Sequence, residues 1–272
     1  MKNKPLTFHE TFPPEREHIG QLLLLADTMN YMNKEDISRV TGIPTGKSSG
    51  KVIPHIIYAQ YMGLLEVKKR ERKYYRLIKT QLGEIVTKFD VFLMEPLSQL
   101  LCHYGLTSIS GAEIWHFIFS DYIGTHGREV NRADVERSLL YRYGKVVNVS
   151  PFVSCYTRNT SFGQLRLLKA DKERWIFTPH VYDRTLQYAC AYTLLQEWDR
   201  SAPDKKEITT DDLIHKLKWN AAFLWDSTTT LDVLSAMQEL KVVKLNRQLS
   251  PITVIRSMDT QTALKSIYSS LV

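Results

Sequence analysis

The sequence predicts an α+β protein that is mostly helical and consists of tandem winged helix-turn-helix modules joined by helices. Apolar residues recur at helical spacing over much of the chain, and glycine and proline separate the periodic segments. Pairs of short apolar stretches with a polar turn between them follow the helices, which is typical of β-hairpins. The chain has 272 residues, 43% of them hydrophobic and 24% charged, which suits a globular protein with a sizeable core.

The N-terminal segment indicates the first module. Helices are predicted over 13–31, 34–41 and 51–61, and strands over 64–67 and 74–78. Pro13 and Pro14 suit a first helical turn, where their missing N–H groups would be unpaired anyway, and Thr11 precedes them as a cap. Gly63 ends the third helix in a left-handed conformation. The order of helices followed by a hairpin is that of a winged helix, with the basic run 68–73 as the turn of the wing.

The same plan recurs further along the chain. Helices are predicted over 82–99, 130–143, 185–198, 209–217 and 228–240, and hairpin strands over 164–168, 174–177, 242–245 and 252–255. We therefore expect an N-terminal arm and winged-helix domain (1–90), a helical middle domain with a hairpin (91–200) and a C-terminal winged-helix-like domain (201–272). The polar segment 201–206 is the predicted linker. The alternative is one mixed domain whose hairpins pair into a single sheet.

Charge indicates the partner. The formal net charge is +7, and seven basic residues lie between Val67 and Lys79 against one acid, Glu71. Basic clusters of this kind attract phosphates and give affinity for nucleic acid more than choice of sequence. The predicted phosphate-binding residues of the wing are Lys68, Lys69, Arg70, Arg72 and Lys73.

Residues at the start of the third helix are predicted to face the DNA major groove. They follow a loop rich in Gly, Ser and Lys, where small residues let the backbone approach a phosphate and helix-start N–H groups attract anions. The candidates are Lys47, Ser48, Ser49, Lys51 and His55. Lys51, His55 and Tyr58 share one helical face by spacing. The alternative is a solvated face on a protein-interaction module.

Several kinds of chemistry lack support, so we expect no enzyme, no cofactor and no metal. The segment 42–48 resembles a nucleotide-binding loop, but it has three residues between its glycines where that loop needs four. Glu66-Val67-Lys68 matches half of a restriction-type nuclease core, without the Pro-Asp that should precede it. There is no CxxC pair and no HxxxH spacing. The three cysteines, distant and odd in number, fit reduced thiols in the cytoplasm. No apolar run could span a bilayer, and no signal peptide is apparent.

The segment Phe8-His9-Glu10-Thr11-Phe12, followed by Pro13, resembles the opening signature of a prokaryotic family, domain of unknown function 4007. Segments 37–65, 90–106, 130–143 and 177–198 are similar to later blocks of that family in the same order, although Pro13-Pro14-Glu15 and the longer loop 44–50 depart from it. The residues themselves leave two roles for the signature open. Phe8 and Phe12 could anchor the N-terminal arm, while His9 and Glu10 either pair internally or face a partner.

The resemblance implies a place in prokaryotic DNA-modification and phage-defence loci, beside phosphosulfate-reductase-like proteins. Together with the basic wing, it leads us to expect a non-enzymatic DNA-binding component of such a system. The expected partners are double-stranded DNA and a protein encoded in the same locus, and a homodimer is a further option. The alternatives are a protein-interaction adaptor for a larger defence effector, such as a phosphosulfate-reductase-like protein or an ATPase, and a transcription regulator of the locus.

Overall fold

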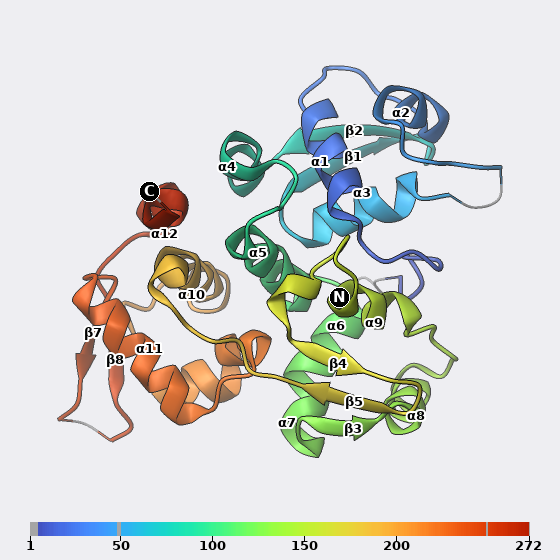
Figure 1. Cartoon of the computed structure of the whole chain (residues 1–272). Coiled ribbons are helices and arrows are strands. Elements are labelled where there is room, and N and C mark those ends of the chain that lie inside the picture. Colours follow the sequence, from blue (N-terminus) through green and yellow to red (C-terminus); the bar gives the residue numbers. More distant parts are fainter. Residues whose placement is uncertain (1–4, 48–49, 249, 272) are drawn as a thin grey trace. The chain divides into compact units, whose positions relative to one another are not determined.

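The computed structural model describes residues 5–47, 50–248 and 250–271, and the chain divides into two compact units, residues 1–178 and 179–272. The described part is mostly helical with three small antiparallel sheets (Figure 1), which confirms the α+β class. The hairpins lie in separate sheets, not in the single sheet of the alternative prediction. The predicted boundary at 90/91 falls inside the first unit, and that at 200/201 falls inside the second.

The first unit begins with helices and a hairpin: α1 (Arg16–Leu25), α2 (Lys34–Thr41), α3 (Val52–Tyr61), β1 (Leu65–Arg70) and β2 (Tyr74–Lys79). The predicted caps of α2 are present, because the Asn33 side chain accepts from the Asp36 N–H and Gly42 takes the left-handed conformation. Helix α1 begins three residues later than predicted. The buried Pro13 and Pro14 precede it, and the Ser161 hydroxyl donates to the Pro14 carbonyl.

The rest of the first unit is helical around a second sheet: α4 (Gln81–Asp90), α5 (Pro96–Thr107), α6 (Glu113–His116), η1 (Phe117–Tyr122, a π-helix), α7 (Ile123–His126), β3 (Glu129–Asn131), α8 (Arg132–Tyr143), α9 (Ser150–Thr157), η2 (Gly163–Leu165), β4 (Leu168–Ala170) and β5 (Arg174–Phe177). The helix predicted over 82–99 is two helices. They separate because Leu93 is left-handed and Asp90 accepts from the Met94 and Glu95 N–H groups. Strand β4 is shorter than predicted, since residues 163–165 form a 3₁₀ turn.

The second unit contains η3 (Arg184–Leu186), α10 (Gln187–Ser201), β6 (Glu207–Thr209), η4 (Asp212–Lys216), η5 (Trp219–Phe223), α11 (Ser227–Glu239), β7 (Val243–Asn246), β8 (Thr253–Arg256), α12 (Thr260–Ser266) and η6 (Ile267–Leu271). Asp226 and Asp259 cap α11 and α12 through their carboxylates. Its core is aromatic, with Trp198, Trp219 and Phe223 almost fully buried.

One topology recurs three times. A short strand precedes a group of helices and pairs with the second strand of the hairpin that follows, as the sheet orders β3-β5-β4 and β6-β8-β7 show. In the N-terminal part the short strand is reduced to Met32, which bridges Tyr75 on β2 through hydrogen bonds of 3.0 and 2.8 Å. Each of these short strands is preceded by a helical segment, ending with α1, α7 and α10 respectively. The repeat expected from the sequence is therefore a repeat of strand pairing as well as of element order.

Candidate nucleic-acid interface

The basic hairpin, β1 and β2 with their turn, carries all five predicted phosphate-binding residues of the wing in exposed positions. Residues 68–70 lie within strand β1 and not in the turn as predicted. Only Glu71, Arg72 and Lys73 connect the strands, because Arg70 pairs with Tyr74. Lys68 faces Arg76 across the strands, so both cations share one face with Arg70. The opposite face carries Leu65 and Leu77, which are buried.

Aromatic rings hold several of these cations. The Arg70 guanidinium lies 5.0 Å from the Tyr31 ring centroid and 5.7 Å from that of Tyr74. Lys73 lies over Tyr74 and Lys69 over Tyr75, each at 5.4 Å. Such contacts orient a cation without neutralising it. Within the described part of the chain, the five wing cations form no ion pair, so their charge faces solvent.

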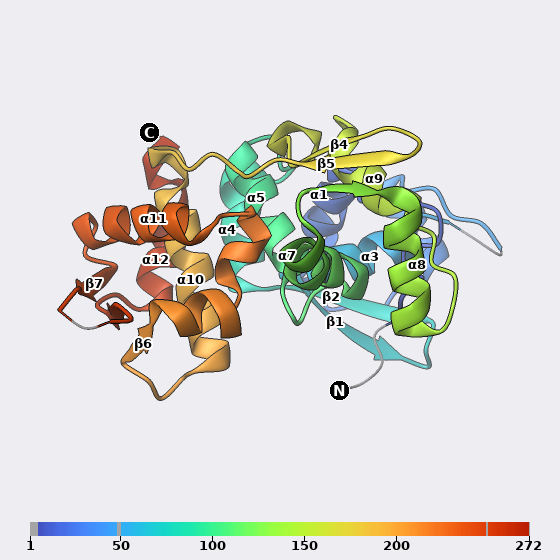
Figure 2. The same ribbon diagram turned by 90° about the horizontal axis from the view of Figure 1, so that it is seen from below.

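The hairpin is tied to the helices at its base. The Asp27 carboxylate accepts from the Lys79 N–H at 2.9 Å and lies 3.1 Å from the Lys79 ammonium. Figure 2 shows the hairpin at the margin of its unit, with β1 on the outer side. The base is therefore fixed while the tip is free to meet a partner.

The loop before α3 is only partly described. Lys47 is exposed, whereas Ser48 and Ser49 lie outside the described residues. The Lys34 ammonium donates to the Gly46 and Lys47 carbonyls at 2.6 and 3.2 Å, which fixes the backbone beside Lys47.

His55 does not face the solvent, which corrects the prediction that it reads a DNA groove. The predicted polar face of α3 packs inward, and both His55 and Tyr58 have no exposed surface. The Tyr58 hydroxyl donates to the Phe12 carbonyl at 3.0 Å, so the N-terminal arm covers this face. Helical spacing correctly grouped the residues, but the segment that buries them comes from elsewhere in the chain.

Lys51 and His55 instead belong to a polar cluster with Glu15 and His18. The Lys51 ammonium lies 2.7 Å from Glu15 Oε1, and His18 Nδ1 lies 3.3 Å from Glu15 Oε2. His55 Nε2 accepts from the Glu15 N–H at 3.0 Å, and His55 Nδ1 donates to the Lys51 carbonyl at 2.7 Å. The sequence signal for this cluster is the Glu-x-x-His spacing at 15–18, which runs from the N-cap residue Glu15 to His18 in the first turn of α1.

Burial controls the charges in this cluster. It lowers the pKa of His55 to about 4 and also lowers the pKa of His18. Burial acts in the opposite direction on Glu15, but the hydrogen bond from Lys51 and the charges of His18 and Lys51 outweigh it and lower the pKa of that carboxyl. At neutral pH the cluster therefore holds a Glu15–Lys51 ion pair beside neutral imidazoles.

The cluster also has the donor types of a metal site, since one oxygen or nitrogen atom each of Glu15, His18 and His55 lie within 4.8 Å of one another. One carboxylate and two imidazoles suit zinc or a similar transition ion better than magnesium, which prefers oxygen ligands. A bound ion would have to displace Lys51 from Glu15 and the Glu15 amide from His55 Nε2. The geometry is thus that of a closed hydrogen-bond network.

In the half-motif Glu66-Val67-Lys68, Glu66 and Lys68 lie on the exposed face of β1 and Val67 lies on the opposite face. Its cross-strand neighbours are Ile78, opposite Glu66, and Arg76, opposite Lys68. Neither neighbour supplies a second carboxylate, so the hairpin itself does not complete a nuclease metal site.

The signature 8–12 forms a compact turn whose apolar side faces the core. Phe8 is buried with its ring edge-on to Tyr58 at 4.8 Å and to Tyr61 at 5.0 Å. His9 is fully buried, its Nδ1 lies 3.0 Å from the Glu10 carbonyl, and burial lowers its pKa. Phe12 is half-buried, while Glu10 and Thr11 are exposed. This arrangement supports the structural role for Phe8 and His9.

These features define an α+β chain with an exposed basic hairpin at the margin of its first unit. None of the described helices is long and apolar enough to cross a membrane. No family model and no curated protein matches the sequence. Two solved structures resemble the fold: a magnesium ion-bound SspB crystal structure (TM-score 0.78) and an SspB crystal structure (TM-score 0.76). Each is 16% identical to this chain, and each alignment covers 99% of this chain and 89% of the SspB chain.

Proposed function

We propose that this chain is a non-enzymatic DNA-binding component of a prokaryotic DNA-modification or phage-defence system, acting in the cytoplasm. The observation that carries the proposal is the basic hairpin, where five exposed cations converge without an ion-pair partner among the described residues. Cations in this arrangement release counterions from a duplex when they meet its phosphates. The defence context rests on the sequence resemblance at residues 8–12.

The recurrent topology supports winged-helix modules. Such a module is expected to contain a helix, a short strand, further helices and a hairpin whose last strand pairs with the short strand. This arrangement occurs three times among the described residues. In this proposal the basic hairpin is the wing of the first module. Because His55 is buried, selectivity for sequence would come from the loop around Lys47 and the start of α3, or from a partner.

A salt titration of duplex DNA binding tests the proposal. The alanine variant of Lys68, Lys69, Arg70, Arg72 and Lys73 should bind more weakly, and the slope of log K against log salt should become shallower by about 0.9 for each phosphate that the variant no longer neutralises. A matched control replaces five exposed cations outside the hairpin: Lys145, Lys169, Lys172, Lys205 and Lys244. Equal slopes for the wing variant and the wild type would reject the hairpin as the DNA-binding surface.

A protein-interaction adaptor is the second candidate, favoured by the hairpin β4–β5. Its turn carries Asp171 and Glu173, and the Asp171 carboxylate accepts from the Glu173 and Arg174 N–H groups at 2.8 and 2.7 Å. An acidic, rigid turn is unsuited to phosphate and suits a protein surface. Co-purification with a protein from the same locus in a complex without DNA would favour this function. A stable homodimer on a symmetric operator would instead favour a transcription regulator.

One of the SspB structures contains a magnesium ion. The cluster of Glu15, His18 and His55 offers only one carboxylate, so we infer that it does not bind magnesium. Melting temperatures with and without millimolar MgCl₂ should agree. A marked increase that Glu15→Gln abolishes would show instead that the cluster binds magnesium.

A further inference from the structure

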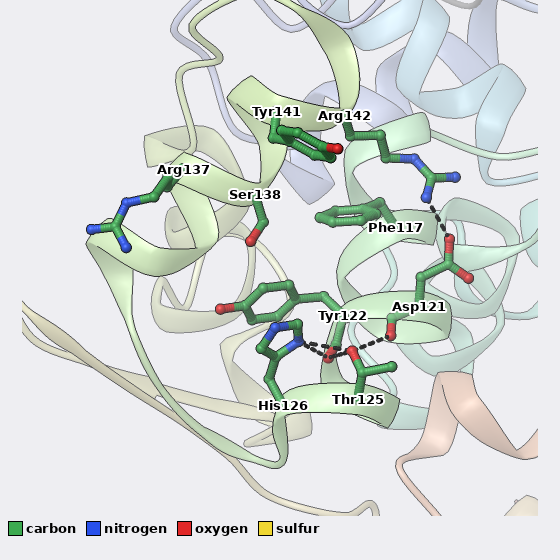
Figure 3. Close-up of a pocket in the computed structure, with 9 residues that line it drawn as sticks. All are labelled: Phe117, Asp121, Tyr122, Thr125, His126, Arg137, Ser138, Tyr141 and Arg142. Carbon is green, nitrogen blue, oxygen red and sulfur yellow. Dashed lines mark hydrogen bonds and ion pairs between the residues drawn. The ribbon is translucent and has the colours of Figure 1, made fainter.

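A pocket of about 550 Å³ lies in the first unit between the π-helix η1, helix α7 and helix α8 (Figure 3). Its volume is in the range of small-molecule and cofactor sites. The pocket lies on different elements from the basic hairpin, and the residues that line it lie between Phe117 and Arg142. It therefore raises a binding question separate from duplex recognition.

Three aromatic rings from both sides line the pocket: Phe117 and Tyr122 from η1, and Tyr141 from α8. Tyr141 is 93% exposed, so this large ring stands in water at the pocket mouth. Figure 3 shows it above Phe117 in the view drawn. The Tyr122 ring is backed by His126, stacked at 4.1 Å with an angle of 9° between the planes. Phe117 and Tyr122 are only 7% and 2% exposed, so the Tyr141 ring is the aromatic surface that favours a flat ligand.

The lining also carries groups that can recognise a polar ring edge. The Arg142 guanidinium lies 4.9 Å from the Phe117 ring centroid and 3.2 Å from an Asp121 carboxylate oxygen. The Ser138 hydroxyl reaches down from α8 toward Tyr122 (Figure 3). Guanidinium, carboxylate and hydroxyl together match the donors and acceptors on the edge of a nucleobase.

The backbone at this site is unusual as well. Phe117, Asp121 and Tyr122 all come from a six-residue π-helix. Such segments are rare and occur frequently at functional sites, because the widened turn reorients side chains at a cost in stability. A second π-helix, η4, lies in the second unit, so this feature supports the site together with the pocket's lining and not by itself.

The sugar phosphate of a bound nucleotide would meet Arg137 at the rim. This side chain is 76% exposed and lies 3.0 Å from Asp134. An exposed ion pair of this kind contributes little and can be exchanged for a phosphate contact. Unlike an aromatic side chain of a protein partner, a nucleotide would use both the ring walls and the rim cation.

We propose that this pocket binds an unstacked nucleobase, supplied either by a free nucleotide or by single-stranded nucleic acid. The site goes beyond the proposed duplex binding, since a base inside a duplex cannot enter it. Stacking against the exposed Tyr141 ring supplies the affinity, and the polar edge contacts orient the base.

The test uses the full chain with dAMP, and with a ten-nucleotide single strand containing 2-aminopurine, whose fluorescence falls when the base stacks. Tyr141→Ala should weaken binding about tenfold, while Tyr141→Phe keeps the ring and should bind within about twofold of the wild type. Val146→Ala is the control, since Val146 is 82% exposed and does not line the pocket. Because Tyr141 is exposed, its variants should fold, which circular dichroism checks.

The source of the base follows from the two ligands. If the single strand binds at least tenfold more tightly than dAMP, and Tyr141→Ala weakens both interactions, the natural ligand is single-stranded nucleic acid. If the two affinities are equal, the natural ligand is the free nucleotide. The five-alanine wing variant separates this site from the proposed function, because it should lose duplex binding and keep dAMP binding. Absence of binding by both ligands at millimolar concentration overturns the proposal. So does an effect of Tyr141→Ala no larger than that of Val146→Ala, or tighter Tyr141-dependent binding of N-acetyl-tryptophanamide than of dAMP.

Discussion

His55 shows how one buried residue can connect distant parts of the chain. Its Nδ1–H donates to the carbonyl of Lys51, just before α3, and its Nε2 accepts from the N–H of Glu15, just before α1. Only the neutral ring with the proton on Nδ1 can make both bonds. A protonated ring would present a second donor to the Glu15 N–H and would lose that acceptor.

This bonding predicts a specific response to acid. The pKa of His55 is about 4 in the folded chain and near 6.5 when unfolded, so the unfolded state takes up a proton first. The stability that the neutral ring provides is complete above about pH 6.5, and it decreases as the pH falls toward 4, by about 3 kcal/mol in all. Chemical denaturation between pH 7 and 4 measures this loss.

Long-range ¹H–¹⁵N spectra check the protonation state directly. They should show His55 as the Nδ1–H tautomer and uncharged at pH 5. His55→Gln should flatten the acid side of the stability curve, since glutamine does not titrate. An imidazolium signal from His55 at pH 6 would contradict the bonding described.

At the scale of the element, the basic hairpin combines an ordered base with a strained tip. Glu71 and Arg72 both have positive φ, 51° and 59°, in the three-residue connection. Residues with a Cβ adopt this region at a cost, and hairpin turns normally place glycine or asparagine there. Glu71 is also the acid within the run of basic residues.

Glu71→Asn should therefore have two effects. Stability should rise by about 0.5–1 kcal/mol, because asparagine tolerates the left-handed region. DNA affinity at low salt should rise modestly, because one negative charge is removed from the wing. The control is Glu173→Asn in the turn of the hairpin β4–β5. It removes the same charge at a residue whose φ is not positive. Thermal melts and duplex titrations of both variants separate the two effects, and a loss of stability in Glu71→Asn would argue against strain at this turn.

At the scale of the whole molecule, the two compact units each enclose free cysteines. Cys102 and Cys155 are fully buried in the first unit, and Cys190 is fully buried in the second. Burial raises the pKa of all three thiols. Thiols without exposed surface or thiolate character are poor nucleophiles.

We expect none of these thiols to react with a disulfide reagent in the native protein, and all three to react after denaturation. At intermediate denaturant, mass spectrometry assigns the labelled cysteines and so shows which unit opens first. Rapid labelling of any of the three in the native state would contradict the burial described.

The sequence predicted the three hairpins and many of the helices because their periodicity is local, but it did not predict α6, α7, α9 and α12. It missed the three-residue strands β3 and β6, which are too short to show alternation, and the single bridge at Met32. The prediction that His55 is exposed was wrong because the segment that covers it, at Phe12, lies 43 residues away in the chain. The aromatic pocket could not be predicted either, since a π-helix has no recognisable pattern and its opposite wall comes from α8.

Strand β1 has a further consequence. Among the described strands it pairs only with β2, so its outer N–H and C=O groups form an open edge that another chain could extend. Lys68, Lys69 and Arg70 repel a second copy at that edge, whatever else they bind. Solubility and nucleic-acid contact therefore depend on the same side chains, and the five-alanine wing variant should self-associate. Serine replacements, with light scattering alongside the titration, would keep weakened DNA binding distinct from aggregation.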